Sequence, residues 1–134
     1  MGIFDRIKKV WSQDMAIDLE AMARAVDDSV SLVYLCNPNN PTGMAIEGDE
    51  LRSFCREVSR KAAVMIDEAY NELTDKPDGS SMVDLVRGGE NILVTRTFSK
   101  IFGMAGLRVG YGMGHPDIVR VTKDHVMAWP NGVG

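Results

Sequence analysis

Residues 63–70, Ala-Val-Met-Ile-Asp-Glu-Ala-Tyr, give the clearest indication of the fold, because four apolar residues run without a break into two carboxylates. Similar apolar runs occur upstream, at residues 33–36, and downstream, at residues 92–95. Short, unbroken runs of this kind are typical of strands that are buried on both faces of a parallel sheet. About thirty residues separate the starts of successive runs, which is enough for a crossover helix.

Helical patterns fill the segments around these runs. Apolar residues recur at helical spacing in residues 17–26, 47–61 and 80–87, and two glycines follow the last of these segments. After the third run, residues 107–113 are predicted to form a strand and residues 117–127 a helix. This alternation predicts an α/β fold of three layers, in which a mostly parallel sheet is flanked by helices.

The chain is expected to divide into a short leader, residues 1–11, and one domain over residues 12–134. An amphipathic helix is possible in the leader, with apolar residues on one face and basic residues on the other: Ile3, Phe4, Ile7, Val10 and Trp11 against Arg6, Lys8 and Lys9. Such a helix could lie on an anionic membrane. A helix that docks on the domain, or a leader without a role, is the favoured interpretation, so a membrane partner is not expected.

Composition narrows the class of protein. The 134 residues carry 15 basic and 19 acidic side chains, a net charge of −4 without a basic block, which argues against nucleic-acid binding. No apolar run approaches the roughly 20 residues that cross a bilayer, and no signal-peptide pattern is present. Cys36 and Cys55 are interpreted as buried free thiols of a cytoplasmic protein. His115 and His125 lack neighbouring ligands, so no metal site is expected.

Chemically unusual residues follow each of the three apolar runs directly. In open α/β sheets, ligands bind beyond the carboxyl ends of the strands. The segments at these ends are residues 37–43, 67–70 and 96–100. The sequence therefore predicts that these segments meet at one edge of the sheet and form a ligand site there.

The first two of these segments each allow two interpretations. The loop Asn-Pro-Asn-Asn-Pro-Thr-Gly at 37–43 is stiffened by two prolines; it is a structural turn or a presenter of an amide donor. Asp67 ends a buried strand and needs a cation or a donor there. A protonated pyridine nitrogen would serve, and Tyr70 could then reach the hydroxyl of the same ring. The alternative for Asp67 is a helix-capping or surface carboxylate.

The third segment leads into residues 97–108, Thr-Phe-Ser-Lys-Ile-Phe-Gly-Met-Ala-Gly-Leu-Arg. Its lysine, Lys100, lies among hydroxyls and eight residues before Arg108. A lysine in such a setting suits an aldehyde cofactor that also carries a phosphate, because the amine can bind the aldehyde while hydroxyls and guanidinium bind the anion. Taken alone, a lysine such as Lys100 is far more often a surface lysine of a soluble protein than a cofactor ligand.

Together the three segments resemble the fold-type I pyridoxal-phosphate enzymes, specifically class I/II aminotransferases of the histidinol-phosphate aminotransferase type. The resemblance covers residues 17–134 and rests on the loop at 37–43, on Asp-Glu-Ala-Tyr at 67–70, and on Ser99-Lys100 with the glycines that lead to Arg108. It implies the large domain of the aspartate aminotransferase fold, present in part. It also implies that the whole enzyme is a homodimer whose site lies at the subunit interface.

The resemblance assigns catalytic roles to three residues. Lys100 would bind pyridoxal phosphate as a Schiff base and then act as the acid and base at the substrate. Asp67 would pair with the pyridinium nitrogen of the cofactor and keep the ring an electron sink. Tyr70, together with Asn40, would hydrogen-bond the 3′-oxygen of the ring.

The phosphate of the cofactor would be held by Thr97, Ser99 and Arg108, by the same resemblance. The implied reaction transfers an amino group between an amino acid, or an amine like histidinol phosphate, and a 2-oxo acid. Two alternatives stay open at this point. One is a lyase or decarboxylase that uses the same cofactor, and the other is a non-catalytic fragment that acts as a binding module.

Overall fold

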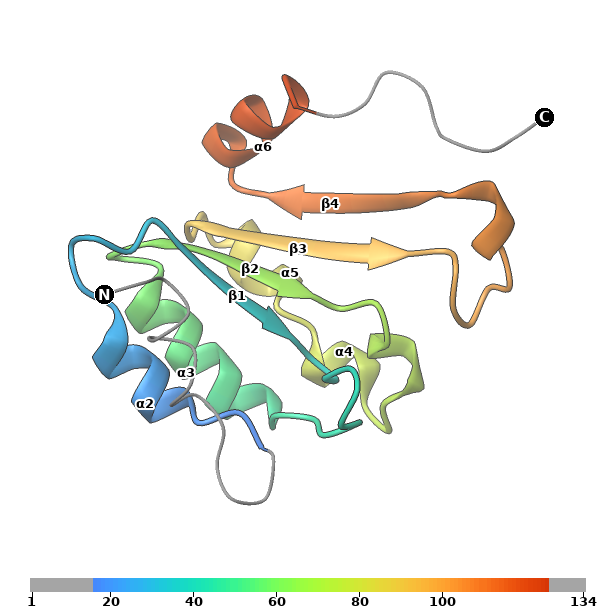
Figure 1. The fold of residues 1–134 in the computed structure, drawn as a ribbon, viewed down its shortest axis with the longest axis horizontal. Helices are drawn as coiled ribbons and strands as arrows, with labels where there is room; N and C mark the ends of the chain where they lie inside the picture. The colour runs from blue at the N-terminus through green and yellow to red at the C-terminus, as the bar shows by residue number, and fades with distance from the viewer. Residues whose placement is uncertain (1–15, 126–134) are drawn as a thin grey trace.

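The computed structural model describes residues 16–125, which form one four-stranded sheet with helices packed on it (Figure 1). The strands are β1 (Leu32–Cys36), β2 (Ala63–Asp67), β3 (Ile92–Thr97) and β4 (Gly110–Gly114), and they lie in that order across the sheet. The pairs β1–β2 and β2–β3 are parallel, whereas β4 is antiparallel to β3. The predicted α/β fold with a mostly parallel sheet flanked by helices is confirmed.

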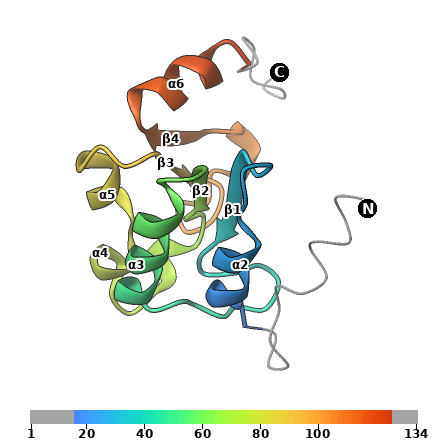
Figure 2. The same cartoon turned by 90° about the vertical axis from the view of Figure 1, so that its left-hand side faces the viewer.

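Five α-helices are found in the described residues: α2 (Leu19–Ala25), α3 (Gly48–Val58), α4 (Pro77–Ser80), α5 (Val83–Arg87) and α6 (Pro116–Lys123). Single 3₁₀ turns occur at Asn71–Leu73 and Ala105–Leu107. Helices α3, α4 and α5 lie on the same side of the sheet, α2 packs beside α3, and α6 lies at the β4 edge (Figures 1 and 2). The crossovers that connect the parallel strands therefore contain helices, as the spacing of the apolar runs predicts.

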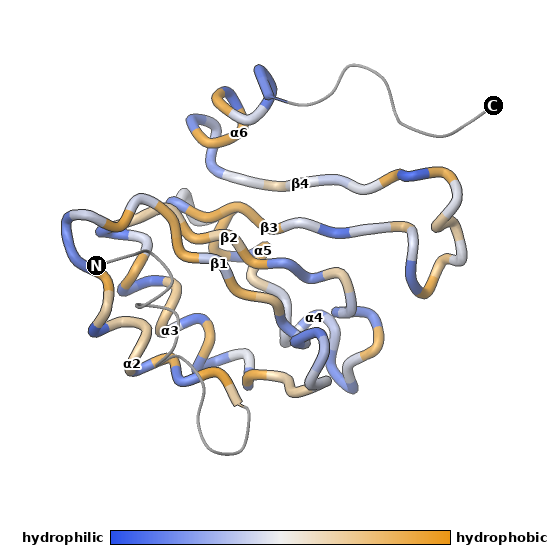
Figure 3. Tube along the Cα trace, viewed as in Figure 1, coloured by the Kyte–Doolittle hydropathy of each residue, from blue (hydrophilic) through white to orange (hydrophobic). Residues whose placement is uncertain are grey.

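Alternation along the strands places the core on one face of the sheet. The residues on that face are buried against α3 and α5: Val33, Leu35, Val64, Ile66, Ile92 and Val94. The same strands form the apolar centre of the chain in Figure 3. On the opposite face, Leu32 is 56% exposed and Tyr34 52% exposed. The sequence predicts strands that are buried on both faces. Within the described residues the core face is buried, whereas the opposite face is exposed at β1.

The predicted helix at residues 80–87 is wrong in one respect, because it is broken into α4 and α5. Ser81 lies between them in an extended conformation, with φ −77° and ψ 143°. Its hydroxyl donates to a carboxylate oxygen of Glu68 at 2.9 Å, and the backbone N–H of Met82 donates to the other oxygen at 2.7 Å. The buried carboxylate thus takes the backbone N–H of Met82, which a continuous helix would bond to its own backbone carbonyl.

The predicted strand at residues 107–113 begins later than expected, at Gly110. Arg108 has φ 53° and ψ 45°, the left-handed conformation that interrupts an extended chain. From Gly110 onward, β4 pairs closely with β3, and a Cβ built on Gly114 would lie only 2.9 Å from the Cδ1 of Leu93. The glycines of β4 therefore allow the close approach of the Leu93 side chain.

Some predictions fall outside the described residues. The leader at residues 1–11 lies there, and so do the last two residues of the helix predicted at 117–127. Within the described part of that helix, α6 begins at Pro116 and is capped by His115, whose Nδ1 accepts from the backbone N–H of Asp117 at 3.3 Å.

Both cysteines are buried free thiols, as the sequence predicts. Burial, followed by the charges of Glu68, Asp84 and Glu90, raises the pKa of Cys55 to about 12. A thiol that is both buried and protonated is a poor nucleophile. We therefore expect iodoacetamide at pH 8 to alkylate Cys55 far more slowly in the folded chain than in 6 M urea, as followed by mass spectrometry. Equal rates in the two conditions would contradict the packing described here.

Candidate functional site

The three segments at the carboxyl ends of the parallel strands meet around one cavity, as predicted. The cavity has a volume of about 450 Å³, within the usual range of ligand clefts. Its lining comprises Ile17, Met22, Tyr34, Leu35, Cys36, Asn39, Asn40, Asp67, Ala69, Tyr70 and Lys100. Four of the seven predicted site residues are therefore brought together here, one or two from each segment: Asn40, Asp67, Tyr70 and Lys100.

The loop after β1 is held by a buried asparagine at its base. Asn37 is 1% exposed, and its Oδ1 accepts from the backbone N–H of Ile46 at 2.8 Å, while its Nδ2 lies 3.4 Å from the Ile46 carbonyl. Within the loop, the amide of Asn39 donates to the Thr42 hydroxyl at 2.8 Å, and Gly43 takes a positive φ of 72°. These contacts fix the loop from which Asn40 projects, so the turn is structural and also presents an amide.

Replacing Asn37 by alanine should lower the free energy of unfolding by about 1–3 kcal/mol, because the partly buried N–H and carbonyl of Ile46 lose their partner. Urea unfolding followed by circular dichroism measures this change. Asn40→Ala is the matched control in the same loop, because the Asn40 side chain is exposed; its expected cost is below about 1 kcal/mol. Equal losses for the two variants would mean that Asn37 does not hold the loop.

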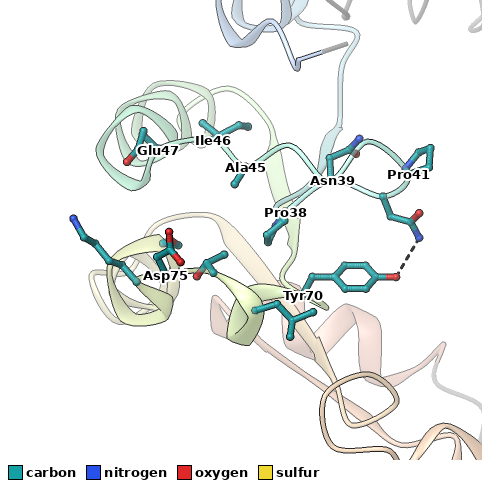
Figure 4. Close-up of a pocket in the computed structure, with 14 residues that line it drawn as sticks. Pro38, Asn39, Pro41, Ala45, Ile46, Glu47, Tyr70 and Asp75 are labelled. Carbon is teal, nitrogen blue, oxygen red and sulfur yellow. Dashed lines mark hydrogen bonds between the residues drawn. The ribbon is translucent and has the colours of Figure 1, made fainter. Parts of the chain in front are cut away.

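Asn40 and Tyr70 contact each other across the cavity. The Nδ2 of Asn40 lies 3.2 Å from the Tyr70 hydroxyl, the contact drawn as a dashed line in Figure 4. The Nζ of Lys100 lies 5.1 Å from the centroid of the Tyr70 ring, within the range of a cation–π interaction. Tyr70 therefore stands between the amide of the first segment and the amine of the third.

Asp67 uses both carboxylate oxygens inside the fold. Its Oδ1 accepts from the backbone N–H of Ala69 at 3.1 Å, and its Oδ2 accepts from the Tyr34 hydroxyl at 3.1 Å. The first contact closes the turn after β2 but caps no helix, because the 3₁₀ turn that follows has Tyr70 at its N-cap without a side-chain cap hydrogen bond. Each carboxylate oxygen offers about two acceptor positions, so Asp67 retains capacity for a further donor at the cavity.

The segment that carries Lys100 is closed by its own backbone. The N–H of Phe98 donates to the Val109 carbonyl at 3.1 Å, and the N–H of Met104 donates to the Phe98 carbonyl at 3.0 Å. The Phe98 ring packs against Phe102 and Tyr111, with centroids 5.5 Å away in each case. These contacts anchor the residue two positions before Lys100 to β4.

The other three predicted site residues, Thr97, Ser99 and Arg108, do not line the cavity. The hydroxyl of Thr97 accepts from the backbone N–H of Ser99 at 3.1 Å, which shapes the turn before Lys100. The guanidinium of Arg108 donates to the Ala105 carbonyl at 2.9 Å. Arg108 also has a left-handed backbone, a conformation that costs on the order of 1–2 kcal/mol for a residue other than glycine.

Two charged residues at the strand ends were not singled out from the sequence. Glu68 is 1% exposed and binds the guanidinium of Arg96 through Nε at 3.0 Å and Nη2 at 2.8 Å. Burial lowers the pKa of Arg96, but the hydrogen bond and charge of Glu68 outweigh burial and raise it above its ordinary value. The ion pair joins the end of β2 to the end of β3 on the face opposite Asp67, because side chains alternate along a strand.

A second cavity, of about 630 Å³, lies next to the first and shares Asn39, Asn40 and Tyr70 with it (Figure 4). It opens between the loop after β1 and the segment from Leu73 to Ser80. Its further lining residues include both acidic and basic side chains, Glu47, Asp75 and Lys76. Tyr70 therefore lines two hollows at the same edge of the sheet.

Neither a metal centre nor a membrane span is found in residues 16–125. No three histidine, cysteine or carboxylate side chains of this part of the chain are grouped closely enough to hold a metal ion. Likewise, none of the helices described for it has the length and apolar character that crossing a bilayer requires.

Comparison with known proteins gives consistent results. Residues 3–129 match the model of the family described as aminotransferase class I and II. The chain is 42% identical over 113 residues to a histidinol-phosphate aminotransferase of Lysinibacillus sphaericus, covering 84% of this chain and 31% of that protein. It is 48% identical over 106 residues to an aromatic amino acid aminotransferase of Mycobacteroides abscessus, covering 79% of this chain and 30% of the other.

The fold also matches a solved structure, that of histidinol-phosphate aminotransferase from Sinorhizobium meliloti in complex with pyridoxal-5′-phosphate. The TM-score is 0.76 at 29% sequence identity, and the match covers 91% of this chain and 33% of that one. This chain thus spans about a third of the length of the relatives it matches. The family match over most of the chain, the sequence identities and the shared fold agree, and the chain belongs to the class I and II aminotransferase family.

Proposed function

We propose that this chain binds pyridoxal 5′-phosphate and that its site transfers an amino group between an amino acid and a 2-oxo acid. The observation that carries the proposal is the convergence of Asn40, Asp67, Tyr70 and Lys100 on one cavity at the carboxyl ends of the parallel strands. The names of the relatives support it, since those proteins are aminotransferases. When bound, the cofactor supplies an electron sink for the carbanion that forms at the substrate Cα.

The residues around the cavity fit this cofactor. Asp67 retains acceptor capacity that a protonated ring nitrogen would use, and a fixed carboxylate favours the protonated ring. Asn40 and Tyr70, which lie 3.2 Å apart, would both hydrogen-bond the 3′-oxygen. Thr97, Ser99 and Arg108 do not line the cavity, but they belong to the same segment as Lys100. In this proposal they would bind the phosphate, with the hydroxyls setting direction and the guanidinium supplying charge.

Lys100 would act twice. Its Nζ would hold the cofactor covalently through the cofactor aldehyde. During amino transfer the same Nζ would act as base and then as acid, taking the proton from the substrate Cα and returning it to the carbon of the cofactor that bears the amino group. The Tyr70 ring, 5.1 Å from Nζ, would keep the amine over the cavity.

We propose an amino acid, or an amine such as histidinol phosphate, as the donor, in line with the relatives' names. Homodimerisation and a cytoplasmic location are further parts of this proposal. Two buried free thiols support the location, because such thiols persist in a reducing compartment. We also propose residues 12–134 as part of a cofactor-binding large domain, preceded by the leader at residues 1–11.

Amino-acid turnover tests the proposed reaction. The chain loaded with pyridoxal phosphate is mixed with histidinol phosphate or an aromatic amino acid, and the products are measured. Amino transfer predicts the carbonyl product and one equivalent of the aminated cofactor, without release of ammonia or carbon dioxide. Release of carbon dioxide would instead indicate a decarboxylase, and release of ammonia a lyase. Cofactor that stays unchanged with every amine would reject the proposed reaction for this chain.

A further inference from the structure

Tyr34 is a side chain of the cavity that neither the sequence motifs nor the proposed reaction uses. It lies on β1, two residues before the end of the strand, and it lines the cavity with Asp67. The register pairs Cys36 with Asp67 and Tyr34 with Met65. Because paired residues of adjacent strands project to the same face, Tyr34 and Asp67 share the open face of the sheet.

The Tyr34 hydroxyl is a direct partner of Asp67. It donates to the Oδ2 of Asp67 at 3.1 Å, across the gap between β1 and β2. Burial, followed by the charge of Asp67 and this hydrogen bond, raises the pKa of Tyr34 to about 12, and Cys36 adds to the effect. The hydroxyl therefore stays protonated near neutral pH and is available as a donor.

Two donors from different parts of the chain thus fix the Asp67 carboxylate. The N–H of Ala69, in the turn after β2, binds Oδ1, and the Tyr34 hydroxyl, on the neighbouring strand, binds Oδ2. The terminal torsion of an aspartate is otherwise soft, with a broad range of accessible angles. One donor on each oxygen restrains that torsion, so the plane of the carboxylate is set by the sheet itself.

We propose that Tyr34 is a positioning residue for Asp67: its hydroxyl holds the carboxylate in the orientation from which Asp67 pairs with the ring nitrogen of the cofactor. The inference rests on the proposed function, because it gives Tyr34 a role only through the partner of Asp67. Positioned hydrogen-bonding groups of this kind raise the affinity and effectiveness of a site because less reorganisation accompanies binding.

A double-mutant cycle on cofactor affinity tests the inference. The dissociation constant of pyridoxal phosphate is measured by absorbance titration for the wild type, Tyr34→Phe, Asp67→Asn and the double variant. We expect Tyr34→Phe to weaken binding roughly fivefold to tenfold, the effect of one ordinary hydrogen bond. In the Asp67→Asn background, the same change should have little further effect, because Tyr34 acts through the carboxylate.

Tyr111→Phe is the matched control, since it removes the hydroxyl of another partly exposed tyrosine, which lies on β4. It should leave the dissociation constant unchanged. A second readout needs no cofactor: in the chain labelled with ¹³C at tyrosine Cζ, Asp67→Asn should lower the pH at which Tyr34 ionises. Tyr34→Phe assigns the resonance.

The outcomes separate the inference from the proposed function. Unchanged affinity in Tyr34→Phe, in a wild type that does capture the cofactor, overturns the inference alone. Equal effects of Tyr34→Phe with and without Asp67 also overturn it, because Tyr34 would then act on the cofactor directly. If Tyr34 ionises at the same pH in Asp67→Asn as in the wild type, its hydroxyl does not contact Asp67, and the inference is wrong. A wild type that does not bind the cofactor overturns both.

Discussion

Replacing Glu68 by alanine should lower the free energy of unfolding by about 3–5 kcal/mol, the usual result of removing one partner of a buried ion pair. The carboxylate is almost fully buried and accepts four hydrogen bonds, from the Ser81 hydroxyl, the Met82 N–H and two nitrogens of Arg96. Without it, the partly buried guanidinium of Arg96 would keep only its contacts to Ser81 and Glu72.

The loss of unfolding free energy in Glu68→Ala should exceed that of a single local contact, because Glu68 joins three elements. It follows β2 directly, binds the residue before the last of β3, and holds the break between α4 and α5. A typical domain is stable by about 5–15 kcal/mol in total, so this one change could remove most of the margin. The expected observation is a large fall in the urea midpoint, or a chain that is unfolded at 25 °C.

One further variant separates charge from shape at this position, and a variant elsewhere serves as the control. Glu68→Gln keeps the size of the side chain but removes the charge, and we expect it to lose more than half of what the alanine variant loses. Arg120→Ala is the control, because the Arg120–Asp117 pair is exposed on both sides, at 77% and 72%; exposed pairs contribute about 0–1 kcal/mol. A Glu68→Ala loss as small as that of Arg120→Ala would show that the buried pair does not stabilise the fold.

Replacing Lys100 by alanine should abolish covalent capture of pyridoxal phosphate and slow amino transfer by at least about 10²–10⁴-fold, the usual contribution of a general base. No other amine among the residues that line the cavity can replace Nζ. Visible absorbance of the mixture with cofactor measures capture, and the rate of product formation measures transfer. Lys100→Arg should show the same loss, because a guanidinium keeps the charge but does not attack the aldehyde.

Lys123→Ala is the matched control for these variants, since Lys123 is an exposed lysine at the end of α6. It should bind the cofactor as the wild type does. All three variants should unfold at nearly the wild-type urea concentration, because Lys100 is exposed and its removal leaves the core intact. Capture that persists in Lys100→Ala would remove Lys100 from the site.

The layout of the sheet could be predicted from the sequence because its signals are local. Three apolar runs at regular spacing predict parallel strands, and the rule that ligands bind at their carboxyl ends selects the segments that line the cavity. Asn40, Asp67, Tyr70 and Lys100 do line it. The roles given to these residues came from a family resemblance, and the fold supplies their proximity.

Features that depend on tertiary contacts could not be read in the same way. The break in the helix predicted at residues 80–87 is held by Glu68, far away in sequence, whose carboxylate binds the backbone N–H of Met82 and the Ser81 hydroxyl. The delayed start of β4 depends on the left-handed backbone of Arg108, which a sequence pattern does not reveal. The position of Tyr34 near Asp67 could have been predicted, because alternation along β1 and β2 places both side chains on the same face.

The most direct test of the central claim is to locate the cofactor on the chain. The wild-type protein is mixed with pyridoxal phosphate, reduced with borohydride, digested and analysed by mass spectrometry. A single cofactor bound to the peptide that carries Lys100 is the predicted result. Modification spread over exposed lysines such as Lys61, Lys76 and Lys123, or the absence of any modified peptide, would contradict the claim that this cavity is a pyridoxal-phosphate site.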